Sequence, residues 1–320
     1  MREQIIALAK KLDADLVGFA PADRFAKDDP VFWIFPETKT VIGLGFRVLR
    51  GIYRGVEEGT TYYQYTTMGV ENLEETVMPM ALLRLSNLIE ENGYTALPQR
   101  YSPLIMEEED KTNPEVDYTD VFRGVKKEPQ LDFLRCAVPC GFGEESKIHS
   151  LLTPEFGPFV RVCFILTDME LEASPLFAGK LCDGCDACIR ECPGRAIDES
   201  GETNSWRCAV YYNGACGSKN PFMPPEAFAD FDMHTKIEII KGTAEFDTEG
   251  AKQILDNIYF YPPAKHFYRT SICGRACDRA CYIHLEEKGL LPVPSVAPSA
   301  QKKIGNCLLT SWRKENVQNE

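Results

Sequence analysis

The sequence has no long apolar run, only four histidines and fewer basic than acidic residues. Its longest apolar run, from Val41 to Phe46, is far shorter than the roughly 20 residues that a membrane-spanning helix needs. Charges interrupt the N-terminal segment every few residues, and we interpret it as mature sequence of a soluble, cytoplasmic protein. A formal net charge of −13 gives no general attraction to a phosphate backbone. We therefore expect neither a membrane nor a nucleic acid as partner.

Cysteine, in contrast, is abundant. The 320 residues include 13 cysteines, an odd number, and a reducing compartment disfavours a disulfide framework. A chain of 36.0 kDa is long enough to bury the core of one large domain or two ordinary ones, so it does not need disulfide bonds for stability. Ligation of a metal or a cluster is the natural use of these thiols.

Hydrophobic periodicity and composition divide the chain into three parts. Helices are predicted over residues 3–13, 62–91 and 248–259, and strands over residues 16–19, 40–48 and 160–171. Residues 101–132 are acid-rich and lack periodicity, which predicts a long irregular segment. The composition changes abruptly to Cys, Gly, Asp and Pro near residue 175. We expect a first domain at 1–175, a second at 176–290 and an extended tail at 291–320.

The first cysteine island has the spacing C-x2-C-x2-C-x3-C followed by Pro193, and its cysteines are Cys182, Cys185, Cys188 and Cys192. Bacterial ferredoxins hold [4Fe–4S] clusters with this run, in which three thiolates reach one cubane and the fourth points to another. A zinc ribbon would usually present two separated C-x2-C pairs. The island therefore predicts an iron–sulfur site.

A second island completes the ligands for two clusters. It contains Cys273, Cys277 and Cys281, and Cys208 and Cys216 lie between the islands. By ferredoxin logic, the first three cysteines of the first island pair with Cys281, and Cys192 joins Cys208, Cys273 and Cys277. The island departs from the usual pattern because its first gap is three residues and Tyr282 replaces proline, so the role of Cys216 stays open. For the other cysteines we expect buried apolar environments: Cys136, Cys140, Cys163 and Cys307.

The segment before the first island carries a family resemblance. It contains a Gly141-Phe142-Gly143 turn with Lys147 four residues on, a run LLTPEFGP with Arg161 three residues after it, and a strand ending in Leu166-Thr167-Asp168. In order and spacing these elements resemble the cofactor-contacting core of epoxyqueuosine reductases and reductive dehalogenases, which are cobalamin-dependent iron–sulfur reductases. The resemblance extends over most of residues 1–215, without the helical-repeat domain of the longer epoxyqueuosine reductases or the export signal of respiratory dehalogenases.

The resemblance implies an α+β fold, in which a nitroreductase-like corrinoid-binding domain precedes a ferredoxin-like domain with two [4Fe–4S] clusters. It also implies a corrinoid bound without a histidine ligand, so His149, His266 and His284 are interpreted as surface or packing residues. The expected corrinoid contacts are Gly141, Gly143, Lys147, Thr153, Pro154, Gly157 and Arg161. Glycines would let the backbone lie flat against a macrocycle, although two ordinary glycine turns explain the same pattern.

The reduction also needs a proton donor, for which the sequence offers several candidates. The aspartate that the epoxyqueuosine branch uses about 14 residues before the glycine turn is replaced here by Lys126, Lys127 and Glu128. Dehalogenase-like members use a tyrosine near a basic side chain, because a cation stabilises the phenolate. The candidate catalytic residues are therefore Lys127, Glu128 and Tyr63, with Tyr62 and Tyr65 as alternatives to Tyr63. The alternative interpretation is a solvated lysine pair and tyrosines that cap a helix.

These features predict an oxygen-sensitive reductase of a small organic substrate. Electrons would come from a ferredoxin or flavodoxin and pass through two cubanes to the corrinoid. The alternative from another class is an iron–sulfur electron carrier or reductive activator that serves a separate corrinoid protein. A third interpretation places a flavin in the N-terminal pocket.

Overall fold

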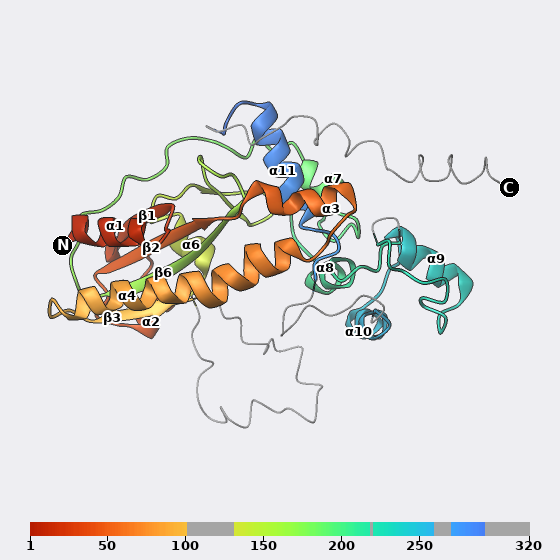
Figure 1. Cartoon of the computed structure of the whole chain (residues 1–320), viewed down its shortest axis with the longest axis horizontal. Coiled ribbons are helices and arrows are strands. Elements are labelled where there is room, and N and C mark those ends of the chain that lie inside the picture. The colour runs from red at the N-terminus through yellow and green to blue at the C-terminus, as the bar shows by residue number, and fades with distance from the viewer. Residues whose placement is uncertain (101–130, 218–219, 259–269, 292–320) are drawn as a thin grey trace, which may run out of the picture.

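In the computed structural model, four antiparallel strands form a sheet with helices on both faces (Figure 1). The structure describes residues 1–100, 131–217, 220–258 and 270–291. The strand order is β1-β2-β6-β3. The strands are β1 (Leu16–Pro21), β2 (Thr40–Arg47), β3 (Ala96–Gln99) and β6 (Val160–Thr167). Two short strands, β4 (Glu144–Glu145) and β5 (Leu151–Leu152), form a separate hairpin.

The helices are distributed along the whole described chain. In the first half they are α1 (Arg2–Lys11), α2 (Pro30–Ile34), α3 (Arg54–Glu58), α4 (Met78–Glu90) and α6 (Phe133–Ala137). In the second half they are α7 (Ala187–Arg190), α8 (Ser205–Tyr212), α9 (Met233–Lys241), α10 (Thr248–Asp256) and α11 (Ala276–Glu287). Two 3₁₀ turns are η1 (Ala22–Arg24) and η2 (Arg50–Tyr53). Within the described residues, each helix is too short or too polar to cross a bilayer.

The alternation of side chains along β2 explains the layers. Ile42, Leu44 and Phe46 face a core shared with α1 and α4, whereas Val41 faces a second core that includes α6. Because successive residues of a strand point to opposite faces, one strand contributes to both cores. The turn that follows α6 lies close to the sheet at Gly43, where a Cβ would lie 3.0 Å from the Cys140 thiol. The three predicted strands correspond to β1, β2 and β6 and the first predicted helix to α1, apart from their ends, whereas β3, β4 and β5 were not predicted.

The helix predicted over residues 62–91 is more complicated than expected. Its C-terminal part is α4, but two π-helical stretches precede it, η3 (Tyr65–Glu71) and η4 (Leu73–Val77). Their main-chain bonds close wider turns than those of an α-helix, so residues 65, 66, 69 and 70 are the buried ones in η3. The predicted helix over residues 248–259 corresponds to α10. Residues 101–130 and 292–320, which carry the predicted irregular segment and tail, lie outside the described residues.

A third apolar core joins the two predicted domains. Its buried members come from both sides of residue 175, and they include Tyr53, Phe159, Leu181, Tyr282 and Leu285. In Figure 1, α11 accordingly lies close to α3 and to the end of the sheet, although more than 200 residues separate α11 from α3 in sequence. The segment with α8, α9 and α10 extends away from the sheet and has its own core. The division at residue 175 stays a prediction.

Candidate metal centre

The first cysteine island folds as an irregular turn that leads into α7. Gly184 has φ +75° and Asp186 has φ +57°, so the chain reverses twice within the motif. The Asp183 carboxylate accepts a bond from the Cys185 main-chain N–H at 3.2 Å and helps to hold the first reversal. These reversals turn the thiols of Cys182, Cys185 and Cys188 toward one pocket.

Cys281 on α11 enters the same pocket. The pocket is lined by the three thiols of the first island, by Cys281 and by apolar side chains that include Leu152 and Leu181. Burial raises the pKa of the Cys281 thiol, and Asp278 and Cys188 add to this shift. Four thiols around one partly apolar pocket are the donor set that a [4Fe–4S] cluster requires. We call this set the first thiol group.

A second thiol group gathers around α8. Burial raises the pKa of Cys208 to about 11, and the neighbouring Cys273 and Cys192 contribute to the shift. Burial also raises the pKa of Cys277, with further contributions from Asp278 and from Cys273 and Cys208. The structure thus brings the eight predicted ligand cysteines into two sets of four. The donor chemistry of both sets fits iron–sulfur clusters, and the ligand assignment itself stays a proposal.

The remaining described cysteines belong to apolar cores. Cys216 is 3% exposed and packs with Ala215 and Ile239 in the core around α8, α9 and α10. Cys136, Cys140 and Cys163 are all buried in the cores of the sheet, as predicted. Burial raises the pKa of Cys140 to about 12, so its thiol stays protonated at neutral pH. Cys307 lies outside the described residues.

Tyr282, which replaces the proline of the ferredoxin motif, has a clear packing role. It is buried and stacks on Phe159 with ring centroids 4.3 Å apart and an interplanar angle of 6°. Phe159 stacks in turn on Tyr53 at 4.4 Å, and Tyr53 stacks on Tyr65 at 5.1 Å. Proline at this position would end the stack. The departure from the motif therefore attaches the second cysteine island to the sheet.

The glycines predicted to contact a corrinoid are explained by contacts within the protein. Gly141 has φ +84°, and a Cβ there would overlap the Pro175 carbonyl oxygen. A Cβ on Gly143 would overlap the Leu152 carbonyl oxygen. On Gly157, a Cβ would lie 3.1 Å from Leu285 of α11. Close backbone atoms explain Gly141 and Gly143, and a left-handed φ of +56° beside the Leu285 side chain explains Gly157, so all three glycines have reasons within the protein.

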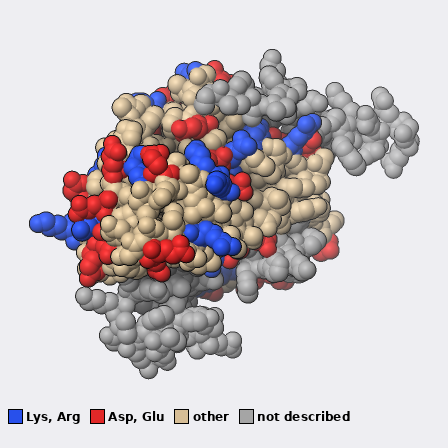
Figure 2. All heavy atoms as spheres, turned by 60° about the vertical axis from the view of Figure 1, so that its left-hand side comes forward, with Lys and Arg blue, Asp and Glu red and all other residues tan. Residues whose placement is uncertain are grey.

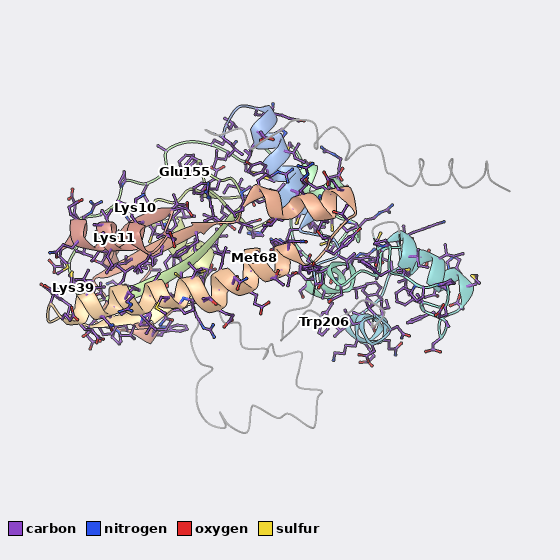
Figure 3. The ribbon with its side chains drawn as sticks, viewed as in Figure 1. Lys10, Lys11, Lys39, Met68, Glu155 and Trp206 are labelled. Carbon is purple, nitrogen blue, oxygen red and sulfur yellow. The ribbon has the colours of Figure 1, made fainter. Side chains whose placement is uncertain are left out.

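The rest of the predicted corrinoid set divides between two places. Thr153 is buried and accepts a bond from the Phe156 N–H at 3.1 Å, within the tight turn that contains Pro154 and the exposed Glu155 (Figure 3). Lys147 lies at the first thiol group, where its ammonium contacts Asp186 at 2.7 Å. Arg161 lies elsewhere, beside the aromatic stack. Lys147 and Arg161 thus have different neighbours within the protein, and the corrinoid contacts stay a prediction.

Arg161, Tyr65 and Glu74 form a polar cluster that the sequence did not predict. Arg161 donates to the Tyr65 hydroxyl at 2.6 Å and lies 3.4 Å from the Glu74 carboxylate. Burial raises the pKa of Tyr65, and Arg161 and Arg275 act against this shift by stabilising the phenolate. Tyr65 and Arg161 are 96 positions apart. No local pattern signals such a pair.

Two buried polar atoms near Tyr65 have no hydrogen-bond partner in the described part of the chain. They are the amide oxygen of Gln64 and the hydroxyl of Thr270. The Ser271 N–H donates to the Thr66 hydroxyl at 3.0 Å. Thr270 precedes Ser271, and Gln64 is two residues before Thr66. Buried polar atoms are normally paired, so unpaired atoms indicate a missing partner such as a bound polar group. This side of the second thiol group fits a cofactor better than the glycine turns do.

Of the predicted catalytic residues, Tyr63 lies in the described part of the chain. Lys127 and Glu128 lie outside the described residues. Tyr63 is 50% exposed, whereas Tyr65 is 2% exposed and holds the arginine contact. Tyr65 thus has an arginine at its hydroxyl, while burial raises its pKa. His149 and His284 contact carboxylates, Asp183 being 2.9 Å from His284, and His266 lies outside the described residues.

Comparison with known proteins gives relatives of two kinds, reductive dehalogenases and epoxyqueuosine reductases. No family model matches the chain. It is 36% identical over 89 residues to the tetrachloroethene reductive dehalogenase of Sulfurospirillum multivorans, covering 27% of this chain and 18% of the relative. It is 22% identical over 242 residues to the epoxyqueuosine reductase of Bacillus subtilis, covering 71% of this chain and 58% of the relative. The chain thus spans less than two thirds of the length of these relatives.

Solved structures of the same two kinds are also found. A catabolic reductive dehalogenase, NpRdhA, in complex with 3-bromo-4-hydroxybenzoic acid has a TM-score of 0.48 at 16% identity, covering 89% of this chain and 36% of that one. An epoxyqueuosine reductase has a TM-score of 0.45 at 15% identity, covering 89% of this chain and 81% of that one. The sequence comparisons confirm the predicted resemblance of this chain to epoxyqueuosine reductases and reductive dehalogenases.

Proposed function

We propose that this chain is a cobalamin-dependent iron–sulfur reductase, an oxidoreductase that delivers two electrons, one at a time, to a small organic substrate. The observation that carries the proposal is the arrangement of eight cysteines in two sets of four, with the second set close to the Tyr65–Arg161 pair. The resemblance to epoxyqueuosine reductases and reductive dehalogenases supports the choice of cobalamin. A bound corrinoid would supply low-potential one-electron chemistry at cobalt.

The ligand sets follow from the grouping of the thiols. Cys182, Cys185, Cys188 and Cys281 would hold one [4Fe–4S] cluster, and Cys192, Cys208, Cys273 and Cys277 would hold the other. The first set lies nearer the surface, because Asp183 and Gly184 at its rim are exposed. An external donor such as a ferredoxin or flavodoxin would therefore deliver electrons there.

The second set is the exit toward the substrate. The Ser271 hydroxyl lies 3.7 Å from the Cys273 sulfur, and the Ser271 N–H donates at 3.0 Å to the hydroxyl of Thr66, the neighbour of Tyr65, which supports a position of this set near Tyr65. Tyr65 would give its proton to the leaving atom when a carbon–oxygen or carbon–halogen bond breaks. Arg161 would stabilise the resulting phenolate. Two electrons from the external donor, the Tyr65 proton on the leaving atom and a second proton from solvent on the carbon balance the reduction.

The substrate we propose is a small molecule. The acidic composition disfavours a nucleic acid, and on the face shown in Figure 2 acidic and basic side chains are interspersed and form no basic stripe. One of the solved relatives, an epoxyqueuosine reductase, is described in complex with a modified tRNA stem loop. Binding of such a stem loop by this chain would replace the small-molecule proposal.

The first experiment is anaerobic expression with cobalamin supplied, followed by iron, sulfide and cobalt analysis and EPR of the isolated protein. About eight irons and one cobalt per chain, with a Co(II) signal that lacks a nitrogen ligand, are expected. A protein that loads eight irons and retains no cobalt after reconstitution would contradict the reductase proposal. Fewer than about four irons would contradict the cluster assignment as well.

The crossed ligand sets have their own test. Serine variants of Cys192 and Cys208 should lose the same cluster signal, and variants of Cys188 and Cys281 should both lose the other. If each island held its own cluster, Cys188→Ser and Cys192→Ser would give the same spectrum instead. The matched control is Cys216→Ser, which should keep both signals because Cys216 belongs to an apolar core.

The second candidate function is an iron–sulfur electron carrier or activator for a separate corrinoid protein. It is favoured by the contacts of the predicted corrinoid residues, since neighbours within the protein already account for Gly141, Lys147 and Arg161. In that case eight irons and no cobalt are expected. The protein should then reduce an added corrinoid protein in the presence of a low-potential donor.

A further inference from the structure

The hairpin strand β4 lies against the loop that begins the first cysteine island. One carboxylate oxygen of Glu144 accepts the main-chain N–H of Leu181 at 2.7 Å and that of Cys182 at 2.6 Å. Both bonds are short, as charge-assisted bonds to carboxylates are. One acidic side chain from the sheet side of the protein thus holds the chain at the first thiol of the motif.

A second residue of the same segment contacts the loop at two more points. The main-chain N–H of Lys147 points to the Cys182 sulfur at 3.4 Å. The Lys147 ammonium contacts the Asp186 carboxylate at 2.7 Å, in the middle of the motif. Glu144 and Lys147 together therefore fix the loop from Leu181 to Asp186. Lys147, a predicted corrinoid contact, thus has its observed partners at the first thiol group.

The charges of the two contacts differ. Lys147 and Asp186 neutralise one another. Glu144 has two amide partners and, in the described part of the chain, no cationic partner. Its negative charge is therefore uncompensated beside the first thiol group. Glu144 also accepts the hydrogen bond of the Cys182 N–H, so this amide is not available to donate to a cluster sulfur.

We propose that Glu144 is a positioning residue that holds the Cys182 loop and lowers the reduction potential of the cluster bound there. Net charge and hydrogen bonds to sulfur are among the factors that set such potentials. An added electron is disfavoured by a nearby anion, and an amide bonded to a carboxylate does not stabilise the reduced cluster. The proposal rests on the proposed cluster at the first thiol group.

The test is the potential of that cluster in Glu144→Gln, measured by anaerobic redox titration followed by EPR. Glutamine keeps an acceptor for the two amides and removes the charge. We expect the equilibrium constant for one-electron reduction to rise about tenfold, which corresponds to a potential about 59 mV higher. The matched control is Glu145→Gln, because the neighbouring carboxylate contacts His149 and not the cluster loop. An equal potential in Glu144→Gln and wild type overturns the proposal.

A second variant tests whether Glu144 holds the loop, independently of the effect of its charge on the potential. Glu144→Ala leaves the Leu181 and Cys182 amides without their acceptor, so those two amides should exchange hydrogen faster in the iron-free chain than in wild type. Unchanged exchange would overturn the positioning role. If wild-type protein has no cluster signal that depends on Cys188 and Cys281, the proposed function fails at the first thiol group. If it loads two and Glu144→Gln leaves the potential unchanged, only the present inference fails.

Discussion

At the scale of single residues, two glycines allow the cost of a left-handed φ to be compared with the cost of a steric overlap. Gly93 and Gly141 both have φ +84°, but a Cβ on Gly93 meets open space, whereas one on Gly141 would overlap the Pro175 carbonyl. Gly93→Ala should lower the free energy of unfolding by about 1 kcal/mol, from left-handed strain alone. Gly141→Ala should lower it by about 3 kcal/mol or more, because crowding adds to the strain. Urea unfolding of both variants measures the difference, and equal losses would contradict the crowding explanation.

The Arg161 cluster gives a second prediction at this scale. Arg161→Met should lower the free energy of unfolding by about 3 kcal/mol, because Glu74 is 7% exposed and would lose the cation that lies 3.4 Å away. The control is Arg54→Met, which breaks an exposed pair with Glu58 and should cost less than about 1 kcal/mol. Chemical unfolding of the two variants under the same conditions compares them. Similar losses would show that the Arg161 pair is as solvated as the surface pair.

These residues also show what a sequence can and cannot predict about a site. The spacing of the first island predicts that Cys182, Cys185 and Cys188 face one centre, because a tight turn leaves few other arrangements. Assigning Cys281 to that centre needed an analogy with ferredoxins, and the structure does bring Cys281 into the pocket. The contact between Arg161 and Tyr65 had no such analogy. It depends on how β6 and η3 pack, and a single sequence carries no local signal for that packing.

At the scale of elements, α11 depends on an aromatic contact for its place. Tyr282→Ala should lower the free energy of unfolding by about 3 to 5 kcal/mol, because it removes a buried ring stacked on Phe159. Tyr94→Ala is the control, since Tyr94 is 43% exposed and its truncation should cost less than about 1 kcal/mol. Because Cys281 precedes Tyr282, the Tyr282 variant should also retain less iron in the first thiol group. Full iron retention would mean that the cluster alone holds α11.

The helix before α4 shows why some element predictions fail. The apolar spacing of residues 62–91 predicted one amphipathic α-helix, and α4 follows it with buried residues at Met78, Ala81, Leu82 and Leu85. In η3 and η4 the turns are wider, so the buried face advances differently along the chain. Both kinds of turn satisfy the backbone hydrogen bonds. The choice between them therefore comes from packing around Tyr65 and Val70, which periodicity does not report.

At the scale of the whole molecule, the two predicted domains meet through a shared core and several polar contacts. Composition indicated where the chain changes character near residue 175. It gave no sign that Tyr282 and Leu285 would pack with Tyr53 and Phe159. Such long-range packing depends on shape complementarity between segments far apart in the chain, and single-sequence patterns report local structure only. The polar contacts between the two parts are open to a test by pH.

His149 connects the two parts through carboxylates on both sides. Its ring contacts Glu145 of β4 and lies 3.1 Å from Glu202 beyond the first cysteine island. These bonds raise the pKa of His149, Glu145 having the larger effect. A pKa raised on folding contributes stability that is full below the unfolded value near 6.5 and is lost as pH rises through the folded pKa. The contact should therefore stabilise the protein most at mildly acidic pH.

The variant that tests this is His149→Asn, because asparagine tolerates the φ of +53° at this position. Thermal unfolding from about pH 6 to 9 should show a lower midpoint for the variant at the acidic end and converging midpoints at the alkaline end. His234→Asn is the control, since the partner of His234, Glu238, lies on the same helix. A deficit in His149→Asn that stays constant with pH would mean that His149 acts through packing and not through its charge. Convergence at high pH would assign the stabilisation to the protonated ring between the two carboxylates.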